Sequence, residues 1–439
     1  AIYKKTNRTL KKPKFTKKAV LIIIITLLTE GLLFIFKHEW VSLLILLVFR
    51  FFLLSLVVYI LNQPTKWLKK YLIKQATKKM SLYKNLIVIG VTGSYGKTTV
   101  KIFLDHILSK NFKVVSTPKH VNTEIGIAKF ILKSNFDNKN IFIVEMGAYA
   151  EGEIKLICDI VKPKIGILTA INEQHLSLFG DIRKTQQTKY ELLRSLPGDG
   201  LAVVNSDNKY CREFLDELKS EVLTFGTDIE FNPSLLVKNI KAGAEGGECT
   251  LVYKGTEVHS RSKIRGEYNV MNIMPCTLVA SHLGMSNDEI TESVYDLPQT
   301  IKIYKYGNCD IVDDSYNSNP TGFRAILDFV NKFKHERRRI VITRGMLELG
   351  DKSNEIHEQI GGEIAYTTDE LVMITPDFIE PLKKGTVGIK YKLDIKEIFE
   401  PEKLLKYIKE LKKTDAVILL ENRIPSIVME EIRNNSKEI

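Results

Sequence analysis

The residues with the clearest chemical signature lie in one short stretch, TGSYGKTT, at 92–99. An apolar run at 86–91 predicts a buried strand before it, and 97–108 predicts a helix after it. A glycine loop between a strand and a helix N-terminus presents backbone N–H groups to an anion, and the helix dipole adds to the attraction. We therefore predict a phosphate-binding loop in which Lys97 reaches the terminal phosphates and the Thr98 hydroxyl binds Mg²⁺.

This loop departs from the common GxxxxGK[ST] spacing, because Val91 stands where the first glycine belongs. The strand, loop and helix nevertheless keep the order that a phosphate cradle needs. We expect nucleotide contacts from the loop and the first helical residues, namely Gly93, Ser94, Tyr95, Gly96, Lys97, Thr98 and Thr99. The alternative interpretation is a glycine-rich turn that binds nothing.

Apolar runs and helical patterns alternate after the loop. Four of these runs predict strands, at 112–115, 141–144, 165–170 and 201–204. This βα alternation predicts an α/β fold with a mostly parallel sheet covered on both faces. Residues 221–265 contain short β-prone pieces and predict a small antiparallel excursion.

Polar side chains follow these predicted strands, where the ligands of parallel sheets collect. Glu145 comes directly after one strand, His175 follows the next, and Lys189 lies on the helix after that. A carboxylate and an imidazole near a triphosphate predict a Mg²⁺ site, although Mg²⁺ generally prefers oxygen ligands. Each residue alone has a simpler interpretation, as a hydrogen-bonded histidine or a solvated lysine.

A second, smaller α/β unit begins after a break near Pro298. Its strands or hairpins are predicted at 304–312, 339–343, 371–374 and 417–420, and its helices at 320–332 and 395–411. We therefore predict a central domain at 85–298 and a C-terminal domain at 299–439.

The N-terminal region differs in composition. Residues 1–80 carry 16 Lys and Arg but 2 Asp and Glu, whereas the whole chain carries 64 and 52. The body of the protein is therefore close to neutral, which argues against a nucleic-acid partner. Five scattered cysteines without a CxxC spacing predict a reducing compartment and no structural zinc.

Two apolar runs, 19–36 and 40–61, lie between the basic clusters of this region. Each is long enough as a helix to cross a hydrocarbon core of about 30 Å. Because both flanks are basic, we predict a transmembrane hairpin at the inner (cytoplasmic) membrane, with the catalytic domains in the cytoplasm. A basic tail (1–18) would precede it and a basic amphipathic linker (62–84) would follow it. The alternatives are two buried core helices and a solvated linker.

Each apolar run carries a charged residue at membrane depth, Glu30 in the first and Arg50 in the second. Charges in hydrocarbon are costly, so we expect the two side chains to face each other across the hairpin. The alternative is separate solvation of each charge by snorkelling or by a partner protein.

A set of spaced motifs resembles the Mur ligase family, most closely its D-alanyl-D-alanine-adding (MurF-type) branch. The motifs are TGSYGKTT (92–99), NTEIG (122–126), EMGA (145–148), HLSLFGD from His175, TKYEL around Lys189, NSD (205–207), EYNVMN (267–272), DDSYNSNP (313–320) and GMLELG (345–350). Their joint order carries the resemblance, which covers roughly 85–439.

The resemblance implies a P-loop central domain, a Rossmann-like C-terminal domain and an ATP-dependent amide ligase of peptidoglycan precursor synthesis. An acceptor carboxylate would attack the γ-phosphate of ATP to give an acyl phosphate, and an amine would then displace phosphate. The acceptor would be a muramoyl peptide, either nucleotide-linked or lipid-linked. The amine would be D-Ala-D-Ala or an amino acid.

The resemblance also implies roles for individual residues. Lys97 and Thr98 would hold phosphate and Mg²⁺. Glu145 and His175 would bind Mg²⁺, and a carbamylated Lys189 would help to hold a second ion.

On the nucleoside side, Asn269 and Asn272 would lie near adenine, and Asp314 of the C-terminal unit would contact the ribose. A site built from both units would close over the acyl phosphate and exclude water.

Several positions depart from the family pattern. Tyr95 and Tyr268 replace the usual Asn and His, ITRGM (342–346) lacks the usual acidic residue, and ENR (421–423) stands where KGSR is expected. The hairpin is expected to replace the family's N-terminal domain, which grips the uridine nucleotide. Two other interpretations are a ligase for another polymer, similar to poly-γ-glutamate synthetase, and an inert ATP-binding membrane scaffold.

Overall fold

The computed structural model describes residues 16–36, 40–172, 181–243, 246–315, 319–333, 336–347, 349–388 and 393–438. The chain divides into two compact units, Ala1–Gln75 and Ala76–Ile439. The first unit contains helix α1 (Lys17–Phe36) and the greater part of helix α2 (Trp40–Met80).

The two N-terminal helices do not form the expected transmembrane hairpin. Of the helices that the structure describes, none is long and apolar enough to cross a membrane. Helix α1 has 20 residues, and α2 continues without a break from its apolar first half into a lysine-rich second half. The predicted inner-membrane location is therefore wrong, and the transmembrane hairpin at 19–61 is not supported. Most of the linker predicted at 62–84 is helical, as the second half of α2. The side chains of Glu30 and Arg50 are outside what the structure describes, so their pairing stays a prediction.

A nine-stranded sheet forms the centre of the first domain of the second unit, in the order β2-β3-β1-β4-β5-β6-β7-β8-β9. Its strands are β1 (Ile87–Thr92), β2 (Val114–Ser116), β3 (Ile141–Glu145), β4 (Ile165–Leu168), β5 (Leu201–Asn205), β6 (Glu221–Gly226), β7 (Leu235–Ala242), β8 (Gly247–Tyr253) and β9 (Thr256–Ser262). Strands β1 to β7 pair in parallel, which confirms the mostly parallel sheet. The region 221–265 is antiparallel only from β8 onward, because β6 and β7 continue the parallel order.

Strand β1 lies at the position in the sheet where a ligand site is expected. It lies between β3 and β4, with Gly90 opposite Val144 on one side and Gly166 on the other. The chain leaves β1 toward β2 and β3 and later reaches β4 and β5 on the other side. The loop after β1 therefore lies at a topological switch point, where open α/β sheets bind ligands.

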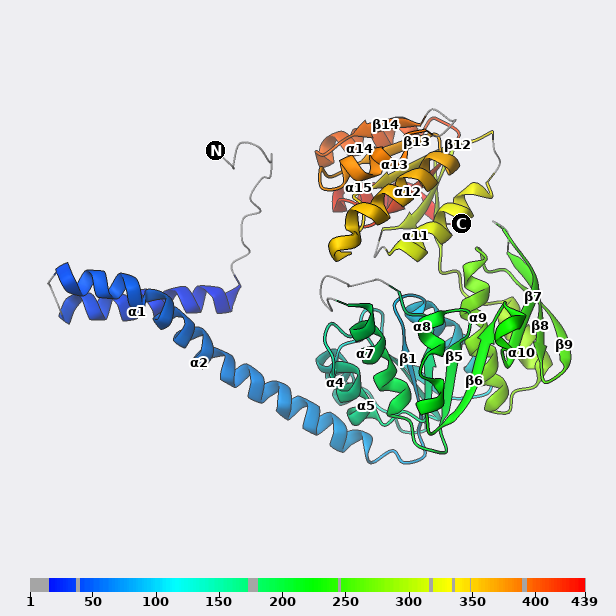
Figure 1. The fold of residues 1–439 in the computed structure, drawn as a ribbon, viewed down its shortest axis with the longest axis horizontal. Coiled ribbons are helices and arrows are strands. Elements are labelled where there is room, and N and C mark those ends of the chain that lie inside the picture. The colour runs from blue at the N-terminus through cyan, green and yellow to red at the C-terminus, as the bar shows by residue number, and fades with distance from the viewer. Residues whose placement is uncertain are drawn as a thin grey trace. The chain divides into compact units, whose positions relative to one another are not determined.

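Helices cover both faces of this sheet (Figure 1). One face carries α3 (Lys97–Leu108), α9 (Tyr268–His282) and α10 (Asn287–Tyr295), which contact one another. The other face carries α4 (Glu124–Lys133), α5 (Glu153–Val161) and α7 (Ile182–Arg194), and the short helix α8 (Lys209–Arg212) follows β5.

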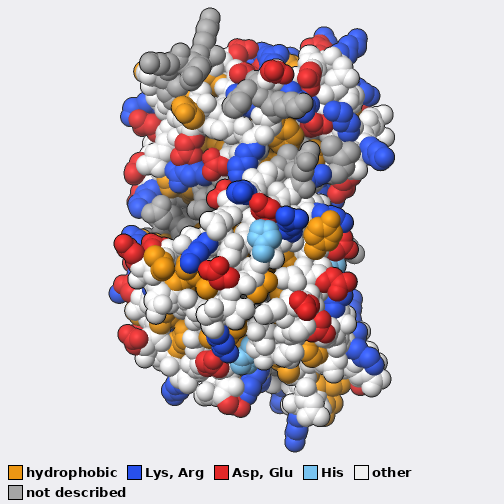
Figure 2. Space-filling view, turned by 90° about the vertical axis from the view of Figure 1, so that its right-hand side faces the viewer, with side chains coloured by type: hydrophobic (Ala, Val, Ile, Leu, Met, Phe, Trp, Pro, Cys, Tyr) orange, Lys and Arg blue, Asp and Glu red, His pale blue; other side chains and the backbone are white. Residues whose placement is uncertain are grey.

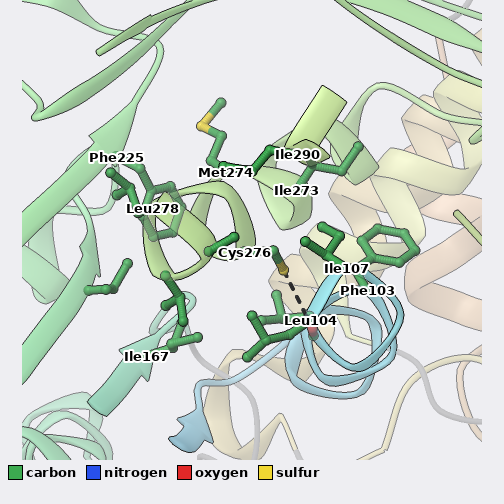
Figure 3. Packing of buried hydrophobic residues seen from close by; sticks show 14 of the residues in the cluster. Phe103, Leu104, Ile107, Ile167, Phe225, Ile273, Met274, Cys276, Leu278 and Ile290 are labelled. Atoms are coloured by element: carbon green, nitrogen blue, oxygen red, sulfur yellow. Dashed lines mark hydrogen bonds between the residues drawn. The ribbon is translucent and has the colours of Figure 1, made fainter. Parts of the chain in front are cut away.

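The contact between α3 and α9 positions the helix that begins at the phosphate loop. Phe103 and Ile107 of α3 meet Ile273 of α9 in one buried cluster (Figure 3). The thiol of Cys276 donates a hydrogen bond to the backbone carbonyl of Val100 at 3.5 Å. Burial of each large apolar side chain contributes about 1.5–3 kcal/mol, so the apolar faces of these helices determine how α9 approaches the loop.

A seven-stranded sheet forms the C-terminal domain, in the order β14-β13-β12-β15-β11-β10-β16. Its strands are β10 (Lys302–Tyr306), β11 (Cys309–Asp314), β12 (Arg338–Thr343), β13 (Glu370–Met373), β14 (Asp394–Glu397), β15 (Ala416–Glu421) and β16 (Lys437–Glu438). Helices α11 (Pro320–Asn331), α12 (Ser353–Thr367) and α13 (Ile379–Gly385) pack together, and α14 (Pro401–Leu411) contacts α15 (Ser426–Asn435). The helix predicted at 395–411 is too long, because Asp394–Glu397 extends the sheet and Pro401 begins the helix.

The surface carries mixed charge. Figure 2 shows basic and acidic side chains interspersed on the face that it presents. Some form exposed ion pairs, for example Lys384 with Glu358 at 2.7 Å. Such pairs contribute only about 0–1 kcal/mol each, so the apolar cores of the two domains supply most of the folding free energy.

Candidate functional site

The phosphate loop requires glycine at two positions. Gly93 and Gly96 have φ angles of 153° and 80°. A Cβ atom on Gly93 would lie 2.0 Å from Thr169 Oγ1, and a Cβ atom on Gly96 would lie 2.5 Å from Asn272 Oδ1. Because Thr169 follows β4 and Asn272 belongs to α9, the loop lies between two elements that are distant in sequence.

Hydrogen bonds tie the tip of the loop to the segment after β4. The backbone N–H of Ser94 donates to Ala170 O at 2.7 Å, and the Ser94 hydroxyl accepts from the N–H of Asn172 at 3.0 Å. The Thr169 hydroxyl donates to Tyr95 O at 2.5 Å. These three hydrogen bonds hold the loop in shape.

Lys97 bends back over the loop from the first turn of α3. Its ammonium donates to Gly93 O at 2.6 Å and to Ser94 O at 3.1 Å. Burial lowers the pKa of Lys97, and the nearby Glu145 carboxylate partly opposes this effect. The lysine therefore lies among the loop atoms that would surround a phosphate.

Glu145 is the centre of the polar network beside the loop. Its Oε2 atom accepts from the Thr98 hydroxyl at 3.0 Å and pairs with Lys101 Nζ at 3.0 Å. Its Oε1 atom accepts from the Asn122 amide at 3.1 Å. Burial alone would raise the pKa of Glu145, but Lys101, together with Lys97 and Asn122, outweighs burial and lowers it. Glu145 is therefore ionised at neutral pH.

Two members of this network were not among the predicted site residues. Lys101 lies one helical turn after Lys97, and its burial in an otherwise apolar helix face is the signal that identifies it. Asn122 stands in the NTEIG motif, but its role depends on β3 being next to the segment that carries it.

Of the two remaining residues predicted at the metal site, the structure describes Lys189 but not His175. Lys189 is buried on α7, and burial, with a further contribution from Lys97, lowers its pKa to about 7. His175 lies outside the described residues, so its role stays a prediction.

The Thr98–Glu145 pair has the donor chemistry that Mg²⁺ prefers. Both side chains present oxygen atoms, and Mg²⁺ commonly takes one or two protein oxygens and completes its shell with water and phosphate. Within the described ranges there is no cluster of three or more His, Cys, Asp or Glu side chains that could hold a metal. A Mg²⁺ ion here would thus depend on ligands from the nucleotide.

A cavity of about 290 Å³ adjoins the loop. Tyr95, Tyr268 and Asn272 line it, as do residues of α11 in the C-terminal domain. Asn269 does not line this cavity; it is buried, donates to Arg265 O at 2.6 Å and accepts from the Asn272 amide at 3.3 Å. The structure therefore brings Asn272 to the loop and makes Asn269 its support.

Thr99 and Asp314 belong to a different and larger cleft of about 1200 Å³. The start of α3, with Thr98 and Thr99, lines one part of it, and the ends of C-terminal strands line another. Burial, with a further contribution from Asp313, raises the pKa of Asp314 to about 8. Asp314 and Asn272 thus line separate cavities, and their expected contacts with the ribose and with adenine stay predictions.

Two family models match the chain, the "Mur ligase middle domain" at 91–280 and the "Mur ligase, glutamate ligase domain" at 301–422. The UDP-N-acetylmuramoyl-tripeptide–D-alanyl-D-alanine ligase of Bacillus subtilis (strain 168) is 26% identical over 350 residues, which are 79% of this chain and 74% of that protein. The ligase of the same name from Synechocystis sp. is 30% identical over 66% of this chain and 62% of its own length. These relatives confirm the expected enzyme class, an ATP-dependent ligase that forms a C–N bond.

The fold has solved counterparts. The MurF ligase from Thermotoga maritima in complex with ADP has a TM-score of 0.70 and 23% identity, over 83% of this chain and 84% of that one. The predicted Mur-ligase fold of the central and C-terminal domains is confirmed. Because the two family models together match more than half of the residues, the chain belongs to the Mur ligase family.

Proposed function

We propose that this ligase uses ATP to join D-alanyl-D-alanine to the carboxylate of UDP-N-acetylmuramoyl-tripeptide, a step of peptidoglycan precursor synthesis. The proposal rests chiefly on the hydrogen bond between Thr98 and Glu145, 3.0 Å long, beside Lys97. This contact supports a site in which a carboxylate and a hydroxyl would face a metal-bound triphosphate. The names of the curated relatives supply the substrates.

The phosphate loop would bind the β- and γ-phosphates through its N–H groups and Lys97. The ADP bound to the Thermotoga maritima MurF ligase, which has a similar fold, supports an adenine nucleotide as a ligand of this protein. Thr98 and Glu145 would hold Mg²⁺, which neutralises charge on the phosphates. Lys101 keeps Glu145 ionised and oriented for this task.

The acceptor carboxylate would attack the γ-phosphorus, forming a C–O–P bond and releasing ADP. The amine would then attack the acyl carbon, lose a proton and expel phosphate. Both steps depend on charge neutralisation and alignment rather than on a protein nucleophile. Residues of both domains line the cavity and the cleft, so their approach would exclude water from the acyl phosphate.

Lys189 would act as a carbamate. An unprotonated amine is the form that reacts with CO₂, and a lysine pKa of about 7 keeps much of Lys189 unprotonated at neutral pH. The carbamate would present oxygen atoms to a second Mg²⁺ ion. His175 would assist Glu145 at the first ion.

Phosphate release tests the proposal. The purified protein is incubated with ATP and Mg²⁺ against a matrix of acceptors (UDP-muramoyl tripeptide, or none) and amines (D-Ala-D-Ala, L-glutamate, or none). We expect release only when UDP-muramoyl tripeptide and D-Ala-D-Ala are both present, and we expect Lys97→Ala to abolish it. Turnover with glutamate alone, or no stimulation by the acceptor, would contradict the proposal.

A further inference from the structure

The end of helix α2 packs against the central domain and has no part in the chemistry above. Ala76 and Met80, one helical turn apart, are both buried. Lys79, next to Met80 in the chain, is partly buried, whereas its neighbour Lys78 is exposed. The two lysines therefore differ in their surroundings, and Lys79 is the one that meets the domain.

Lys79 caps the C-terminus of α4. Its ammonium donates to the backbone carbonyls of Leu132 at 3.2 Å and of Ser134 at 2.5 Å. The last four carbonyls of a helix have no partner within the helix, and they carry partial negative charge. A lysine ammonium supplies both the missing donors and the opposite charge. The contact therefore fixes this end of α4 to the end of α2.

The other end of α4 lies beside the Glu145 carboxylate. Asn122 directly precedes Thr123, the N-cap residue of this helix, and its amide donates to Glu145 Oε1 at 3.1 Å. The backbone carbonyl of Asn122 accepts from the N–H of Gly147 at 2.8 Å. A Cβ atom on Gly147 would lie only 3.1 Å from Asn122 Cγ, so the Asn122 side chain is closely confined. A shift of α4 would therefore change how Asn122 meets Glu145.

Aromatic rings make a second connection, from the residues after α2 to the strand that carries Glu145. Tyr83 packs on Phe136 with the ring centroids 5.5 Å apart. Phe136 in turn packs edge-on against Phe142 of β3 at 5.0 Å. Phe142 lies three residues before Glu145 on the same strand. The end of α2 and the residues after it thus contact both elements that position this carboxylate, α4 and β3.

We propose that Lys79 is a positioning residue for the Mg²⁺ site. It holds α4 so that Asn122 binds one oxygen of Glu145 and leaves the other oxygen directed at Thr98. Residues that orient a metal ligand in this way affect metal affinity although they do not touch the ion. This inference rests on the proposed function, in which Thr98 and Glu145 would hold Mg²⁺. It gives the end of α2 a role in the reaction without contact with a substrate.

The test compares Lys79→Met with the matched control Lys78→Met in phosphate release at varied Mg²⁺. The Mg²⁺ concentration for half-maximal rate should rise about tenfold in Asn122→Ala, and by a smaller factor, above about twofold, in Lys79→Met. The KM values for acceptor and D-Ala-D-Ala should stay within about twofold of wild type, since the change acts on the metal site. Lys79→Arg keeps the charged donors and should recover most of the loss, and Lys78→Met should behave as wild-type protein does.

The double variant Lys79→Met/Asn122→Ala shows whether Lys79 acts through Asn122. Its Mg²⁺ requirement should equal that of Asn122→Ala alone, because two residues in one chain of contacts do not add. Lys79→Gln, which removes the charge but stays polar, makes the same comparison if Lys79→Met does not fold. Multiplied effects of the two changes would overturn the inference.

Two further measurements do not depend on the reaction. Calorimetric titration of a non-hydrolysable ATP analogue, with and without Mg²⁺, should show the same loss of Mg²⁺-dependent affinity in Lys79→Met. Hydrogen exchange of the Gly147 N–H in metal-free protein should be faster in Lys79→Met than in wild type or Lys78→Met, because that N–H is bonded to Asn122. The inference therefore stands or fails separately from the proposed reaction. A Lys79→Met protein that loses thermal stability but keeps its Mg²⁺ requirement within about twofold of wild type would show a merely structural contact and overturn it.

Discussion

The ammonium of Lys101 lies 3.0 Å from Glu145 Oε2, and the two side chains are only 4% and 3% exposed. This buried pair joins α3 to the end of β3 and holds the carboxylate beside Thr98. Removing one member of such a pair leaves a buried charge without compensation, whereas removing both does not. The pair therefore couples the stability of the domain to the geometry of the phosphate site.

Lys101→Met should destabilise the protein by about 3–5 kcal/mol, because Glu145 loses its main counter-charge. The double variant Lys101→Met/Glu145→Gln should recover most of that loss. Urea denaturation of both variants and of Glu145→Gln measures the coupling. Additive effects of the single changes would contradict the pairing.

The same pair predicts a pH effect. The folded protein lowers the pKa of Glu145 below its ordinary 4.5, so this contribution to stability is present above pH 4.5 and is lost as the pH falls through the folded-state pKa. Acid denaturation of Glu145→Gln should therefore show a weaker loss of stability below pH 4.5 than that of wild-type protein.

Lys189 should make stability rise with pH in CO₂-depleted buffer. Its pKa falls from 10.5 to about 7 on folding, so between these values the unfolded chain binds more protons than the folded protein. Urea midpoints measured from pH 7 to pH 10 should increase in wild-type protein relative to Lys189→Met. Equal pH dependence in both proteins would show that Lys189 is solvated.

Added bicarbonate tests whether Lys189 forms a carbamate that the reaction needs. If Lys189 forms a carbamate, phosphate release in CO₂-depleted buffer should increase when bicarbonate is added. Lys189→Met should respond to no concentration of bicarbonate. A wild-type rate that is independent of bicarbonate would contradict the carbamate.

Asp314→Asn should stabilise the protein at neutral pH. Folding raises the pKa of Asp314 from 3.8 to about 8, so the stability of wild-type protein relative to the variant is greatest below pH 3.8 and is lost as the pH rises toward 8. Asp310 on the same strand is the matched control. Burial alone would raise its pKa, but Arg337 and Lys305 outweigh burial and lower it. Asp310→Asn should therefore destabilise the protein at pH 7, and chemical denaturation of both variants at pH 4 and pH 7 checks the two signs.

Tyr95 should contribute to nucleotide affinity through its ring. It lines the cavity beside the loop together with Tyr268, and stacking of a base on an aromatic side chain contributes about 1–3 kcal/mol. Tyr95→Ala should therefore weaken binding of a non-hydrolysable ATP analogue about tenfold, while Tyr95→Phe should not.

Tripolyphosphate is the control for the Tyr95 variants. It lacks a base, so its affinity should be equal in wild-type, Tyr95→Phe and Tyr95→Ala protein by calorimetry. A loss of tripolyphosphate affinity in Tyr95→Ala would show that the substitution deforms the loop and does not remove a stacking partner.

The strongest local signals were the most accurate. The strand predicted at 86–91 is β1 (Ile87–Thr92), and the helix predicted at 97–108 is α3, because a buried apolar run, two glycines and a helix start are all short-range features. The prediction for the N-terminal region failed because it depended on a longer-range feature, the length of a helix. Helix α2 (Trp40–Met80) continues from the apolar run at 40–61 into the lysine-rich residues beyond it, so the two elements predicted there are one helix, and local hydropathy does not show this continuity.

The amino-acid sequence by itself determined the phosphate loop, the α/β alternation and the identity of Glu145 and Lys189 as site candidates, since these follow from residue types and local order. Only the tertiary structure decided which groups meet: Lys101 and Asn122 on Glu145, Asn269 as the support of Asn272, and Asp314 in another cleft. Those contacts join strands and helices that are distant in the chain. They depend on the order of the strands in the sheets. They depend also on burial, which removes water, strengthens each hydrogen bond or ion pair and makes an unpaired polar group costly.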